Sequence, residues 1–166
     1  AVRGGCGPGA RVMALAVRNL QRRIRLSPTR VGRTVRIALR CLGRADRDVH
    51  VSLVDDAVIR RLNARYLGRS SRTDVLAFNL EIPGGSVLLG EVIVSADTAA
   101  RQAARLCVPV ALEVDLLAVH GLLHLVGYDD AEPAEARLMH ERAREILSCS
   151  ADRPVPARLW SGLLRA

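Results

Sequence analysis

The chain has 166 residues, and 49% of them are hydrophobic, which is enough for one domain with a buried core and is typical of a soluble globular protein. No apolar run approaches the roughly 20 residues of a membrane span, so a membrane protein is not expected. All 25 basic residues are arginine, and residues 1–47 hold 12 of them against a single acid. A chain with so basic an end can attract a polyanion there.

The first residues differ in composition from the rest. Residues 1–12 contain four glycines and one proline without periodicity, so we expect a disordered leader, with Met13 as a candidate natural start. The four cysteines are scattered without a CxxC pair, which indicates free thiols in a reducing compartment and favours a cytoplasmic protein. An acid-poor, arginine-rich N-terminus is also typical of a transit peptide, so a mitochondrial location is the alternative.

The first predicted elements are a strand at residues 15–20 and a helix that starts at residues 27–29 and stops at Gly43. The apolar side chains of this helix share one face, and its arginines project from the opposite face. Such a face is either simply solvated or contacts the backbone of RNA. The residues proposed for the RNA contact are Arg33, Arg36 and Arg40.

Strands and helices follow in an order that favours the α+β class. The pattern predicts strands at residues 49–54, 74–80 and 87–94, and helices at residues 56–67, 96–106, 109–126 and 133–147. No internal repeat is present. We therefore expect a single domain over residues 13–150, followed by a flexible C-terminal tail at residues 151–166.

The most informative segment lies at the end of the helix predicted at residues 109–126. His120 and His124 are four residues apart, so they share one helix face and can each point a nitrogen at a common ion about 2.0–2.1 Å away. Gly127 can end the helix in a left-handed conformation and turn the chain back, which brings Asp130 round as a third ligand. Three protein ligands leave one position for water, as in a catalytic zinc site.

The same histidine spacing occurs in zinc proteases of the HExxH kind, where the glutamate after the first histidine is the general base. Gly121 holds that position here and has no side chain that could accept a proton. A zinc protease is therefore the less favoured alternative.

The segment at residues 120–130 resembles the HGxLHLxGYDH signature of the YbeY family at every fixed position but the last, where Asp130 replaces the usual histidine. Residues 73–78 are similar to the family's TDVLSF block, and residues 89–95 to its LGDIVIS block. Leu62-Asn63, Tyr66, Met139 and Glu141 also match, so that the resemblance spans residues 14–147.

The resemblance implies a small α+β domain with a mixed sheet packed with helices, and one zinc ion at the end of a central helix. It also implies a single-strand-specific endoribonuclease that matures the 3′ end of small-subunit ribosomal RNA, associates with the small ribosomal subunit and serves ribosome quality control. The alternative is a metal-binding ribosome-associated factor with little catalysis. Thr73 and Asp74 are expected to line the cleft, although a turn that caps the strand is an equal alternative for both.

Two residues depart from the family pattern. Asp130 gives a His₂Asp site, which is still a sound zinc set and more tolerant of other divalent metals. Leu67 stands where the family usually has an arginine that is held to assist catalysis. The nearby Arg65, Arg69 and Arg72 are the candidates for supplying that charge, and Arg69 and Arg72 are our predicted catalytic residues.

Overall fold

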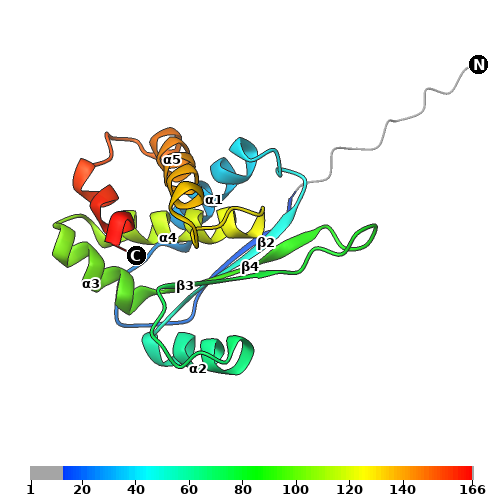
Figure 1. Ribbon diagram of the computed structural model, residues 1–166, viewed down its shortest axis with the longest axis horizontal. Helices are drawn as coiled ribbons and strands as arrows, with labels where there is room; N and C mark the ends of the chain where they lie inside the picture. Colours follow the sequence, from blue (N-terminus) through cyan, green and yellow to red (C-terminus); the bar gives the residue numbers. More distant parts are fainter. Residues whose placement is uncertain (1–12, 166) are drawn as a thin grey trace, which may run out of the picture.

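The computed structural model describes residues 13–165, so the expected leader at residues 1–12 lies outside the described part of the chain. A four-stranded sheet forms the centre of the molecule, with most of the helices on one face and a single helix on the other (Figure 1). In chain order the elements are β1 (Leu15–Asn19), α1 (Pro28–Cys41), β2 (Asp48–Val54), α2 (Asp56–Leu67), β3 (Val75–Asn79), β4 (Leu88–Ser95), α3 (Ala96–Leu106), α4 (Val110–Leu125), α5 (Pro133–Ser150) and η1 (Ala157–Arg165).

The sheet is mixed, with the strand order β1-β2-β4-β3. β1, β2 and β4 run parallel, and β3 pairs antiparallel with β4 at one edge. This confirms the expectation of a small α+β domain with a mixed sheet. Side chains alternate between the two faces along each strand, so on β4 Val92 faces the helices on one side and Glu91 lies on the opposite face.

Three helices begin at side-chain caps that the sequence indicates. The hydroxyl of Ser27 accepts a hydrogen bond from the Arg30 amide at the start of α1, and Asp55 and Ser95 cap α2 and α3 in the same way. At its other end α2 stops at Gly68, which has a left-handed conformation (φ 63°). The caps explain why the predicted boundaries of these helices agree closely with the structure.

α4 is the central helix. It is mostly apolar and buried along almost its whole length, between the sheet and helices α1, α3 and α5. Side chains from every layer join it in the main core, among them Leu39, Val51, Leu116 and Ile146. A side chain carried by α4 is therefore held on a rigid support.

α2 lies on the opposite face of the sheet, where Ile59 packs with Val54, Leu76 and Ile93 in a second, smaller apolar cluster (Figure 1). No single helix among residues 13–165 is long and apolar enough to cross a membrane; α3 and α4 pass that test only together, with a bend of 119° between them.

The C-terminal segment differs from the expectation of an irregular tail. Residues Ala157–Arg165 form the 3₁₀-helix η1, which packs against α3. Leu159 is completely buried in the main core, and Trp160 packs beside it with the Arg144 guanidinium 5.3 Å from its ring centre. Burial of Leu159 helps to hold this segment in place, because burying one such side chain contributes about 1.5–3 kcal/mol.

Candidate metal centre

His120 and His124 project from the last two turns of α4, one helical turn apart. Their rings meet edge to face, with centroids 4.8 Å apart, and the two Nε2 atoms lie 3.2 Å from each other. The spacing follows from the helix itself, since residues four apart lie one above the other. Two nitrogens that can each offer a lone pair therefore converge on one point.

The chain turns back directly after α4. Gly127 takes a φ of 99°, which an L side chain rarely adopts, and the amide of Tyr128 donates to the carbonyl of Leu123 at 3.0 Å. The turn is fixed further by the Asp129 carboxylate, whose Oδ1 accepts from the amides of Asp130 (2.7 Å) and Ala131 (3.2 Å). Asp129 therefore holds the turn and does not itself face the histidines through Oδ1.

The turn places Asp130 against both histidines. Its Oδ2 lies 3.2 Å from Nε2 of His120, and its Oδ1 lies 3.9 Å from Nε2 of His124. The three residues form the one group of three metal-ligating side chains found within residues 13–165, with ligand atoms within 4.8 Å of one another. Tetrahedral ligands bound at about 2.0 Å are about 3.3 Å apart, so the observed spacing fits a single small divalent ion such as zinc.

The surroundings of the two histidines also favour metal binding. Nδ1 of His124 lies 3.1 Å from the carbonyl oxygen of Tyr128, so this nitrogen carries the proton and donates to the carbonyl, which leaves Nε2 with a free lone pair. Burial lowers the pKa of His120, and the neighbouring His124 lowers it further. His120 is thus neutral at pH 7, the form that binds a metal.

A cavity of about 280 Å³ opens beside His120 and Asp130. Its wall includes the buried carboxyl group of Glu113, whose Oε2 has no hydrogen-bond partner among the described residues. Burial raises the pKa of Glu113 to about 7, and the negative charge of Asp74 adds to the shift. Glu113 therefore holds a proton on a large fraction of the molecules at neutral pH.

Several side chains of this cavity were not among the predicted site residues: Glu113, Gln102, Arg105 and His140. Glu113 could have been found, because it precedes His120 by seven residues and so lies on nearly the same face of α4. The other three come from α3 and α5, and nothing in the sequence indicates that these helices meet beside α4.

Gly121 lies directly against the sheet, with no space for a side chain. A Cβ atom built there would lie 2.5 Å from Cγ1 of Val92 and 3.1 Å from Cγ2 of Val75. The glutamate of a zinc protease would therefore not fit at this position, because the helix lies directly on the sheet there.

Of the two residues predicted to line the cleft, only Asp74 does so. Asp74 lines the cavity with His120, and its Oδ2 accepts a hydrogen bond from the Gln102 amide at 3.3 Å. Thr73 donates its hydroxyl hydrogen to the carbonyl of Val75 at 3.0 Å, which is the turn-capping alternative.

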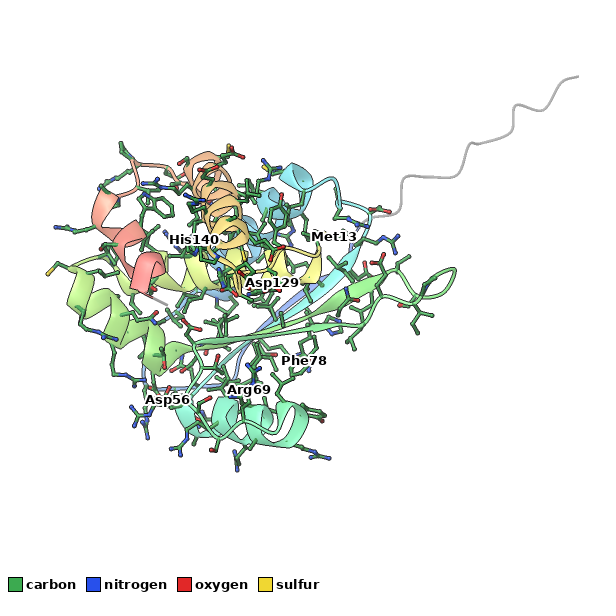
Figure 2. The ribbon with its side chains drawn as sticks, in the orientation of Figure 1. Met13, Asp56, Arg69, Phe78, Asp129 and His140 are labelled. Carbon is green, nitrogen blue, oxygen red and sulfur yellow. The ribbon has the colours of Figure 1, made fainter. Side chains whose placement is uncertain are left out.

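Arg69 and Arg72 lie in the exposed loop between α2 and β3, and neither lines the cavity. Figure 2 shows Arg69 on the α2 side of the sheet, whereas Asp129 and His140 lie on the α4 side. The structure therefore does not bring these two arginines to the metal centre. Arg105 of α3 is the arginine that lines the cavity.

The arginines of α1 stay on the outer surface of the molecule. Arg36 and Arg40 are exposed, and Arg33 forms an ion pair with Asp152 at 2.8 Å. None of the three lines the cavity beside His120. Their contact with RNA stays a prediction.

The fold and these three residues together define a single-metal centre of the His₂Asp kind on an α+β scaffold. Comparison with known proteins places this centre in a family. The model of the family described as "Endoribonuclease YbeY" matches residues 16–150. An endoribonuclease YbeY of Syntrophus aciditrophicus is 37% identical over 140 residues, which cover 81% of this chain and 88% of that protein. One from Anaeromyxobacter sp. is 48% identical over 109 residues, covering 65% of this chain and 57% of that protein.

A solution structure of a Thermotoga maritima protein has the same fold, with a TM-score of 0.57, 21% sequence identity and a match that covers 91% of this chain and 92% of that one. The chain belongs to the endoribonuclease YbeY family. The resemblance of residues 120–130 to the family signature is thereby confirmed, and the function remains to be argued from the site.

Proposed function

We propose that this protein is a metal-dependent endoribonuclease, with zinc as its metal and single-stranded RNA as its substrate. The observation that carries the proposal is the convergence of His120 Nε2, His124 Nε2 and an Asp130 oxygen at the end of α4, in a chain of this family. Three ligands leave coordination positions open, as catalytic metal sites require.

When bound, the ion would supply Lewis acidity toward a phosphate oxygen and lower the pKa of a coordinated water. The chain's own groups would complete the site. The guanidinium of Arg105 can balance the negative charge of a phosphodiester in the cavity, and the buried carboxyl group of Glu113 can hold a proton there at neutral pH. Arg69 and Arg72 remain candidates for contacts with RNA outside the cavity.

The cellular role follows from the family resemblance and is part of the proposal. The RNA would be a precursor of small-subunit ribosomal RNA cut near its 3′ end, with the small ribosomal subunit as the partner and ribosome quality control as the wider task. We expect the protein to act in the cytoplasm, with mitochondria as the alternative.

One observation favours a second candidate, a metal-binding ribosome factor with little catalysis. Leu67, at the position of the family's usual arginine, is 51% exposed at the end of α2, and the arginines nearest to it in sequence do not line the cavity. The catalytic charge that the family resemblance implies at this position is therefore absent. A zinc protease has no such support, since no glutamate fits at position 121.

Cleavage of end-labelled RNA by the wild type and two arginine variants separates the candidates. The proposed endoribonuclease should cut single-stranded RNA but not a duplex, stop when a chelator is added and resume with zinc. Arg105→Ala should slow cleavage by about 10-fold or more, the effect of losing a transition-state contact of about 1.4 kcal/mol. Arg61→Ala, which removes an exposed arginine of α2, is the control. A zinc-loaded wild type that leaves RNA intact, and stays inactive after Leu67→Arg, would favour the binding factor.

A further inference from the structure

The face of the sheet opposite α4 is only partly covered. α2 crosses it at one end, and the remainder carries two rows of side chains that face the same way on neighbouring strands. Arg18, Ser52 and Ile93 form one row, and His50, Glu91 and Phe78 form the other. Where these rows meet α2, a groove of about 430 Å³ lies between the sheet and the helix.

The walls of this groove are aromatic and apolar. Phe78 of β3 and Tyr66 of α2 both line it and are in edge-to-face contact, with ring centroids 5.6 Å apart at an angle of 67°. Tyr66 is 59% exposed, and the Arg65 guanidinium lies 5.5 Å from its ring centre. In Figure 2 Phe78 lies between the sheet and α2, on the side away from His140.

Two polar side chains, Ser52 and Glu91, lie among the apolar ones on the sheet side of the groove. The hydroxyl of Ser52 donates to Oε1 of Glu91 at 3.2 Å, and no other hydrogen bond or ion pair to Glu91 is present among residues 13–165. Glu91 lines the groove, and its carboxylate keeps acceptor capacity beyond the bond from Ser52. A carboxylate repels phosphate, so a nucleic acid can enter this groove only by a base, with its phosphates held outside by arginines such as Arg65.

We propose that this groove is a nucleobase-binding site that prefers guanine. The inference rests on the proposed action on RNA. The Watson–Crick edge of guanine carries two adjacent donors, N1–H and N2–H, which match the acceptor oxygens of a carboxylate. The ring of Tyr66 supplies the stacking surface that single-stranded RNA uses, while Arg65 supplies positive charge at the rim. Uracil offers one donor between two acceptors, which the carboxylate would reject.

The position of the groove links it to the metal centre. β3 is the edge strand, with Phe78 facing the groove and α4 packed against the other side of the strand. A single strand of RNA that passes around this edge can place one base in the groove while a phosphate further along approaches His120. Binding of guanine would then select which phosphodiester reaches the metal.

The single phenylalanine of the chain provides a reporter for this site. In metal-free protein with ring-labelled phenylalanine, the NMR signal of Phe78 should shift saturably when guanosine 5′-monophosphate is added. Uridine 5′-monophosphate should bind at least about 10-fold more weakly, the discrimination expected of a two-bond contact to a base edge. In a second sample with ring-labelled tyrosine, the signal of Tyr128, which packs against the main core, should not shift.

Variants of Glu91 and Tyr66 distinguish recognition of the base edge from stacking of the base on an aromatic ring. Glu91→Gln keeps an acceptor for Ser52 and should reduce the preference for guanine by about 10-fold while the Phe78 signal still shifts. Tyr66→Ala should weaken binding of every nucleotide, and Tyr66→Phe should restore it. Glu135→Gln and Leu138→Ala, two exposed positions on α5, are matched controls and should change nothing.

The outcome is independent of whether the protein cuts RNA. Cleavage of RNA without any response of Phe78 to nucleotides would overturn the guanine site and leave the endoribonuclease in place. If the Phe78 signal responds preferentially to guanine but the protein does not cut RNA, the guanine site stands and the proposed endoribonuclease is contradicted. A Phe78 signal that moves only with an apolar peptide would identify the groove as a protein-docking surface and contradict the proposal.

Discussion

Gly121 and Val92 lie so close together that the distance between them sets how deeply α4 packs into the sheet. A Cβ at position 121 would approach Cγ1 of Val92 to 2.5 Å, closer than real Cβ contacts come. The same contact fixes the position of the neighbouring His120, because α4 cannot move away from the sheet without breaking its packing in the main core. Gly121, where the glutamate of a zinc protease would not fit, therefore also determines how close the metal centre lies to the sheet.

The first prediction concerns this contact. Gly121→Ala should lower the free energy of unfolding by about 1–2 kcal/mol, because overpacking costs more than the gain in helix propensity. Gly32 in α1 is the matched control, since a Cβ there would meet its nearest neighbour, Cδ2 of Leu15, at an ordinary 3.5 Å. Gly32→Ala should raise stability by about 0.5–1 kcal/mol. Urea unfolding of both variants is the measurement, and equal effects would contradict the packing argument.

The second prediction concerns the metal ligands. Replacing His120 or His124 with alanine should abolish binding of the one metal ion per chain, whereas Asp130→Ala should weaken it and Asp130→His should keep or raise it. His50, exposed on the opposite face of the sheet, is the control, and His50→Ala should retain the metal. Elemental analysis of protein purified without added ions gives the stoichiometry. If both histidine variants keep the full amount of metal, His120 and His124 are not its ligands.

The third prediction concerns pH. In metal-free protein the pKa of Glu113 is about 7, above its ordinary value of 4.5, so the folded state favours the neutral carboxyl group. Stability supplied by that preference is present below about pH 4.5 and is lost as the pH rises to about 7, and it amounts to about 3 kcal/mol at most. Glu113→Gln should therefore gain stability relative to the wild type between pH 5 and pH 8.

Urea unfolding at the two pH values, with a chelator present, checks this expectation. Glu135→Gln, at an exposed glutamate of α5, should show no such gain. If the Glu113→Gln variant and the wild type lose stability in parallel over this range, the carboxyl group is not held neutral by its burial.

The fourth prediction concerns the basic face of α1. Charge reversal of Arg36 and Arg40 should reduce the slope of log K against log salt for single-stranded RNA by about 0.7 per lost phosphate contact. Arg33 is left in place because Asp152 already neutralises it. Arg137→Glu, at an exposed arginine of α5, is the control. An unchanged slope in the double variant would mean that the face is solvated and takes no part in binding.

How far the sequence predicts the site depends on which residues are considered. His120, His124 and Asp130 are separated by one helical turn and one tight turn, so local geometry alone brings them together. Asp74, Gln102 and Arg105 reach the same cavity only through the packing of α3 and the sheet against α4, a long-range arrangement that no local pattern encodes.

The fold shows the same division. Ser27, Asp55 and Ser95 indicate where helices begin because a cap acts on its own turn. The place of η1 depends instead on the burial of Leu159 in the main core and on packing against α3, long-range contacts that the local sequence pattern of the tail does not show. The prediction of Arg69 and Arg72 as catalytic residues rests on their nearness to Leu67 along the chain, but neither lines the cavity, and Figure 2 shows Arg69 on the α2 side of the sheet.

Zinc content and RNA cleavage measured on one preparation test directly whether the metal centre is the active site. Wild-type protein, His120→Ala and His50→Ala are analysed for metal and then incubated with the same single-stranded RNA. We expect about one zinc per chain and internal cleavage for the wild type and His50→Ala, and neither for His120→Ala. Cleavage by a metal-free His120→Ala protein at the wild-type rate would contradict this expectation.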